Sequence, residues 1–83
     1  MDAFDGEQVK PFPLALAQEG ERVRIVRHTG GHGIEMRLTD LGLNVGSEVL
    51  VSQRLANQVV VIRGETRLAL GAGMAQKILV AQL

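Results

Sequence analysis

The chain has 83 residues, no cysteine and only two aromatic residues, both phenylalanine, and its formal net charge is zero. The length fits one domain, and the lack of cysteine excludes disulfides, thiolate metal sites and a cysteine nucleophile. With so few aromatic residues the core must be aliphatic, and nucleic-acid bases would find no aromatic platform on which to stack.

The charge is unevenly distributed along the chain. Residues 1–21 hold five acidic residues and one lysine, a net charge of 1 − 5 = −4, whereas residues 22–83 hold eight basic and four acidic residues, a net charge of 8 − 4 = +4. We therefore predict a flexible acidic leader over residues 1–13 and a single domain over residues 14–83. The leader does not read as a secretory signal, and no apolar run approaches the roughly 20 residues of a membrane helix. The sequence thus predicts a soluble, cytoplasmic protein that is not embedded in the membrane.

The first predicted elements are a helical turn and a strand. Residues 14–18 fit one helical turn. Residues 21–28 alternate polar and apolar side chains, as a half-buried strand does. The alternation slips at Val26 and Arg27, which predicts a bend or a bulge, and the glycine-rich residues 29–33 read as a loop.

A short helix follows, and the rest of the chain is organised around it. Ile34, Leu38 and Leu41 share one helical face. Gly42 suits a left-handed residue at the helix end, and Leu43 can fold back onto that end. Residues 44–46 then turn the chain into a strand over residues 47–54.

The C-terminal half reads as short strands joined by turns. We predict a turn at residues 55–58 with Asn57 left-handed, a buried strand over residues 59–62, and a hairpin in which Gly64 takes positive φ. A further strand from Thr66, a helical turn near residues 71–76 and a last strand over residues 77–81 complete the chain. The fold class is therefore mainly β: a small, closed or nearly closed barrel of about five strands with one or two short helical inserts. Its predicted inward-facing residues are Val23, Ile25, Val49, Val51, Val59, Val61, Leu68, Leu70, Ile78 and Val80.

Three residues have the chemistry of metal ligands. His28, His32 and Glu35 offer imidazole and carboxylate groups, which suit Fe(II) or Zn(II). The alternative, favoured by the glycines between the histidines, is a pair of exposed loop histidines. A metal here would bind weakly or be shared between two molecules. The sequence shows no catalytic pattern, so we expect a protein that is not an enzyme and requires no cofactor.

Residues 37–46 carry the most specific motif, R-L-x-x-L-G-L-x-x-G. This motif and an ordered set of landmarks between residues 14 and 80 resemble the FeoA family of small accessory proteins in bacterial ferrous iron transport. The sequence departs from the usual family pattern at Met36, where a second arginine is common, and at Val45, where proline is common. The other landmarks are Leu14, Gly20, Val49, Val51, Gly64, Leu68, Ala69, Leu70, Ala75, Ile78 and Val80.

The resemblance implies an SH3-like barrel and a non-enzymatic role beside the membrane transporter FeoB, which has a cytosolic GTP-binding domain. On this hypothesis the protein modulates the transporter's assembly or GTPase cycle and is recruited to the inner face of the membrane. The candidate partner-binding residues are Arg37, Asp40, Leu43, taken as exposed, and Asn44. The alternative is an Fe(II) or Zn(II) carrier or sensor related to the C-terminal domain of DtxR-type regulators. We expect no nucleic-acid partner, and weak homodimer formation remains open.

Overall fold

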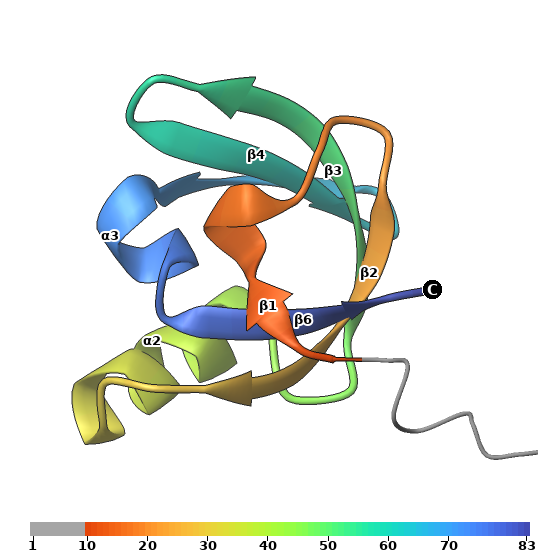
Figure 1. Ribbon diagram of the computed structural model, residues 1–83. Coiled ribbons are helices and arrows are strands. Elements are labelled where there is room, and N and C mark those ends of the chain that lie inside the picture. The colour runs from red at the N-terminus through yellow and green to blue at the C-terminus, as the bar shows by residue number, and fades with distance from the viewer. Residues whose placement is uncertain (1–9) are drawn as a thin grey trace, which may run out of the picture.

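The computed structural model describes residues 10–83, which form one curled antiparallel sheet with two short α-helices and a 3-10 turn (Figure 1). The six strands lie in the order β1-β6-β2-β3-β4-β5. Among the described residues, no helix is long and apolar enough to cross a membrane. In chain order the elements are β1 (Phe12–Pro13), η1 (Leu14–Leu16), β2 (Arg22–His28), α2 (His32–Leu41), β3 (Glu48–Leu55), β4 (Gln58–Arg63), β5 (Thr66–Gly71), α3 (Ala72–Ala75) and β6 (Ile78–Gln82).

The predicted mainly β fold is confirmed, and the alternation in the strands explains it. Nine of the ten side chains predicted to face inward are buried, and the tenth, Leu68, is half-buried and packs against the same core. The pairing of β2 with β6 shifts register between Ile25 and Arg27, so the predicted bulge is present. Closing the sheet around aliphatic side chains removes most of the apolar surface of this valine-rich chain from water.

Two details differ from the prediction. Phe12 and Pro13 pair with Val80 and Leu79, so the sheet begins just before the boundary predicted at residue 14. The acidic residues assigned to the leader, at positions 2, 5 and 7, lie outside the described residues. The prediction of a left-handed Asn57 was wrong, because every residue with positive φ in residues 10–83 is a glycine.

The helix α2 is an insertion between two neighbouring strands. Strands β2 and β3 pair directly, Val23 opposite Val49, and the chain leaves this ladder after β2 and returns to it at β3. Two hydrogen bonds close the excursion: Ile25 N donates to Ser47 O at 2.9 Å, and Gly46 N donates to Ile25 O at 2.7 Å. Both ends of the insertion are therefore fixed to the same strand.

The helix begins earlier than predicted. Its first residue is His32, and Gly31 precedes it with φ of 82°. The glycines that read as loop residues thus supply the left-handed backbone that turns the chain into the helix. Ile34, Leu38 and Leu41 face the barrel as predicted, with Leu38 buried and the other two packed against the core.

The predicted stop at Gly42 is confirmed. Gly42 has φ of 77°, and its N–H donates to the carbonyls of Leu38 and Thr39. Leu43 N donates to Leu38 O at 2.8 Å, the pattern of a Schellman cap. This cap folds Leu43 inward until only 1% of it is exposed, so the prediction that Leu43 is exposed was wrong.

Candidate partner-binding site

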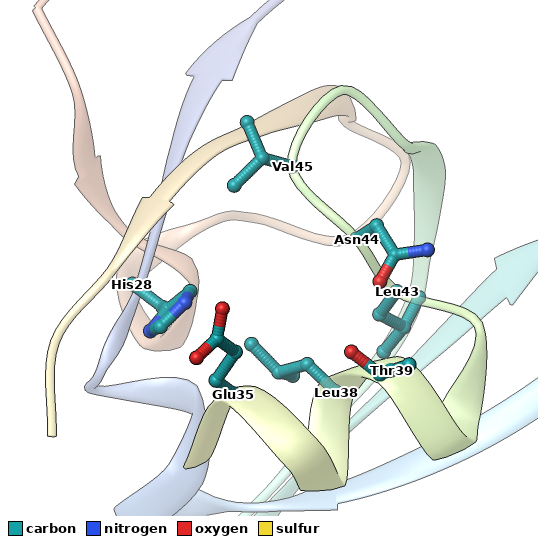
Figure 2. A pocket seen from close by; sticks show the side chains of 7 residues that line it. All are labelled: His28, Glu35, Leu38, Thr39, Leu43, Asn44 and Val45. Carbon is teal, nitrogen blue, oxygen red and sulfur yellow. The ribbon is translucent and has the colours of Figure 1, made fainter. Parts of the chain in front are cut away.

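A cavity of about 250 Å³ lies between α2, the end of β2 and the turn that follows the helix (Figure 2). We call it the inner cavity. Leu38 and Leu43 are buried core residues that also line it, so its floor is aliphatic. Val45, 59% exposed, extends this apolar surface to the rim. The full lining is His28, Glu35, Leu38, Thr39, Leu43, Asn44 and Val45.

Polar oxygens surround the aliphatic floor. In Figure 2 the hydroxyl oxygen of Thr39 and the amide oxygen of Asn44 point toward the interior, and the carboxylate of Glu35 rises from the helix on the opposite side. Glu35 and Thr39 are four residues apart on α2, so they lie on the same face of the helix. Asn44 is held by the turn, in which Ser47 N donates to Asn44 O at 2.9 Å. Acceptors from two segments of the chain are thus positioned around one cavity.

His28 forms the wall of the cavity opposite the turn. It is the last residue of β2, paired with Ile78 of β6. Its Nδ1 atom is buried without a hydrogen-bond partner among the described residues, and Figure 2 shows the ring facing the Glu35 carboxylate. A buried nitrogen without a hydrogen-bond partner is energetically unfavourable, so the ring of His28 has an unused polar atom in this wall.

A second depression, which we call the outer hollow, lies on the solvent side of α2. Its volume is about 280 Å³, and it is lined by His32, Glu35, Met36, Thr39 and Asp40. Glu35 and Thr39 line both spaces, so they form a ridge between them. Met36 is 53% exposed, so it adds an accessible apolar side chain to the lining of the outer hollow.

The structure separates the residues that the sequence grouped as partner contacts. Asp40 lines the outer hollow, whereas Asn44 lines the inner cavity. Arg37 is exposed and lines neither space, because a residue two positions after Glu35 lies on the opposite flank of a helix. Sequence reasoning missed Thr39, although its spacing of four from Glu35 was a signal.

The three predicted metal ligands come only partly together. His32 Nδ1 lies 3.6 Å from Glu35 Oε1, with both side chains largely exposed, while His28 faces Glu35 from the other side of the inner cavity. Within residues 10–83, no group of three His, Asp or Glu side chains is arranged to hold a metal ion. Glu35 is therefore the common neighbour of two separated histidines.

A small barrel with one helix inserted between neighbouring strands, and a cavity beside that helix, defines a compact, mainly β domain. The sequence matches the FeoA domain family over residues 12–82. The chain belongs to this family, which confirms the resemblance seen in the sequence.

Similar proteins agree with this assignment. A protein of Methanocaldococcus jannaschii named Fe(2+) transport protein A is 36% identical over 69 residues, which cover 83% of this chain and 84% of that protein. The crystal structure of an iron uptake regulatory protein (FeoA) superimposes with a TM-score of 0.82 at 27% identity, covering 89% of this chain and all of the other. A manganese-dependent transcriptional repressor has the same fold, with a TM-score of 0.82 at 20% identity, over 90% of this chain and 43% of its own.

Proposed function

We propose that this protein is a non-enzymatic accessory protein of ferrous iron uptake that binds the cytosolic GTP-binding domain of a FeoB-type transporter. Membership of the FeoA domain family supports the pathway. The observation that supports a binding role is the surface of α2, where the inner cavity and the outer hollow lie on either side of the Glu35–Thr39 ridge. On this proposal the protein acts in the cytoplasm and is recruited to the inner face of the membrane by its partner.

The geometry of α2 fits recognition rather than chemistry. Met36 and Val45 are exposed large apolar side chains, one in the outer hollow and one at the rim of the inner cavity. Apolar side chains that surround concave surfaces and are flanked by polar groups are the usual components of an interface. Docking of the partner would cover them and adjust the transporter's assembly or its GTPase cycle.

The test is direct binding to the transporter's purified cytosolic domain, measured by calorimetry, together with the domain's rate of GTP hydrolysis. We expect wild type to bind, and the double variant Met36→Ala/Val45→Ala to bind at least tenfold more weakly. Arg67→Ala is the matched control, because Arg67 is exposed on β5 and lines neither space. Absence of binding and of any change in hydrolysis with wild type would contradict the proposal.

Direct binding of Fe(II) or Zn(II) is a second candidate, and His28 is the observation that favours it. The unpartnered Nδ1 of His28 and the Glu35 carboxylate that its ring faces are both groups that bind these ions. Anaerobic titration of Fe(II), and separately of Zn(II), into wild type and the His28→Ala/His32→Ala variant tests it. We expect weak binding that the double variant loses. Equal heats in both proteins would remove this candidate.

A further inference from the structure

The inner cavity has one carboxylate in its lining, Glu35, beside neutral polar groups. Its rim carries the Glu35 carboxylate, the Thr39 hydroxyl and the amide oxygen of Asn44, all able to accept hydrogen bonds. Among the described residues, no lysine or arginine lines the cavity, although residues 22–83 carry a formal charge of +4. Among the described residues, the nearest basic partner of Glu35 is the exposed His32 on the outer side, whose Nδ1 lies 3.6 Å from Glu35 Oε1. Within the part of the chain that the structure describes, the His28 imidazole is thus the one basic side chain that lines the cavity, and no ammonium or guanidinium faces its oxygens.

From this lining we propose that the inner cavity binds the side chain of a lysine on the partner protein. A lysine ammonium has three N–H donors and no acceptor, which matches three acceptors from three side chains. A carboxylate gives one of these hydrogen bonds a full opposite charge, and charge-assisted bonds of this kind are roughly twice as strong as neutral ones.

The aliphatic floor fits the rest of a lysine side chain. Lysine buries its methylene stem along apolar surface while its charged end stays among polar groups. In the inner cavity exposed Val45 supplies most of that apolar surface, and the nearly buried Leu38 and Leu43 close the floor beneath it. The volume of about 250 Å³ is several times the ~30 Å³ that one water occupies in the liquid, so a long side chain has room.

A lysine fits this arrangement better than an arginine does. A guanidinium binds best as a flat fork on a single carboxylate, with two parallel hydrogen bonds. The inner cavity instead offers one carboxylate and two neutral oxygens distributed around its rim. A compact ammonium with rotatable donors suits such a distribution.

The inference rests on the proposed function, because it assigns the lysine to the transporter's cytosolic domain. That domain would insert the lysine between α2 and the turn after it. Glu35, Thr39 and Asn44 would then select a partner that offers an ammonium at this point. Met36 and Asp40, in the outer hollow, would contact other parts of the same partner.

The first experiment tests the chemistry without the transporter. Isotope-labelled protein is titrated with Nα-acetyl-lysine amide, which keeps its side-chain ammonium. In parallel it is titrated with Nα-acetyl-norleucine amide, whose side chain has four carbons as well but no ammonium. We expect saturable amide shifts at residues 35, 39 and 44 with the lysine compound alone, and about tenfold weaker binding in Glu35→Gln. Equal shifts with both compounds, undiminished binding in Glu35→Gln, or no shift at the solubility limit would overturn the inference.

The second experiment tests the source of the lysine. Binding of the transporter's cytosolic domain is compared for wild type, Glu35→Gln, Thr39→Val and the control Glu65→Gln, whose carboxylate lies in the turn between β4 and β5. We expect the affinity for the domain to fall about tenfold in Glu35→Gln, to fall less in Thr39→Val, and to stay unchanged in the control. Acetylation of the domain's lysines should abolish its binding to wild type. If wild type and Glu35→Gln bind equally, the inference fails and the proposed function stands. If the domain does not bind wild type, the proposed function and this source of the lysine both fail.

Discussion

The barrel and the α2 insertion are built from the same kinds of residue but are stabilised differently. In the barrel, Val23, Val51 and Val61 are 0% exposed and are held by the ladders between neighbouring strands. The insertion contacts the core mainly through one face of α2 and through Leu43. The inner cavity borders this contact, and the outer hollow lies on the solvent side of the helix. The difference shows that this chain separates a closely packed barrel from an insertion that carries its concave surfaces.

Removing a side chain from the centre of the barrel should have the largest effect. Leu70 is 2% exposed on β5, and Leu70→Ala should lower the free energy of unfolding by about 2–5 kcal/mol, since a cavity remains among packed neighbours. Urea denaturation measures this change. Ala69→Ser, at an exposed position on the same strand, is the control and should change stability by less than about 0.5 kcal/mol.

Removing the corresponding side chain from the insertion should cost less and act locally. Leu38 is 3% exposed and is the one buried residue of α2. Leu38→Ala should lower stability by about 2 kcal/mol, at the low end for such a change, because its site borders the inner cavity and can relax. Hydrogen exchange should show lost protection in residues 32–43 and retained protection in β3 and β4. Uniform loss across both regions would contradict the separation of the two parts.

A paired substitution of glycines tests the helix end. Gly42 has φ of 77°, and because a Cβ is unfavourable in this left-handed conformation, Gly42→Ala should cost about 1–2 kcal/mol. The added Cβ would also lie 2.7 Å from Arg63 Nη2, the mobile end of a side chain that can move away. Gly73 lies within α3, with open space where an added Cβ would lie and no positive φ, so Gly73→Ala should stabilise by about 0.5–1 kcal/mol. Thermal unfolding of the two variants should give shifts of opposite sign. Shifts of the same sign would refute the role given to the left-handed cap.

The smallest expected effect is at an exposed ion pair of the barrel. Arg24 Nη2 lies 2.6 Å from Glu48 Oε2 across β2 and β3, with each side chain about half exposed. Glu48→Gln should cost no more than about 0.5 kcal/mol, and the difference should vanish in 1 M salt, where charges are screened over about 3 Å. Urea denaturation at low and high salt checks both points.

The barrel could be predicted from the sequence because its signal is local. Alternation along residues 21–28 and the valine run at residues 59–62 already show which side chains are buried. The insertion could be predicted only in part. Gly42 marked the end of α2. The roles of Gly31 and Leu43 depend on the folded structure: Gly31 precedes the first residue of the helix, and Leu43 is brought into the core by the cap.

The inner cavity was beyond sequence reasoning for the same reason. It joins the end of β2, one flank of α2 and the turn at Asn44, which are separated along the chain. Arg37 and Asn44 are equivalent in the sequence, as polar residues within the same motif, yet helix geometry assigns them to different surfaces. The distances between the residues that line the inner cavity depend on the angle at which α2 leaves β2 and on the turn that returns the chain to β3.

The two hydrogen bonds that join Ile25 to Gly46 and Ser47 have an evolutionary consequence. These bonds fix the end of the insertion to strand β2. Residues 29–45 therefore form a cassette that another sequence of similar length can replace. The condition is that the residues at positions 38 and 43 still cover the end of the core. Sequence changes can then accumulate within the cassette while the strands of the barrel are preserved. Exchanging this cassette between members of the family should transfer partner choice and leave the host barrel folded.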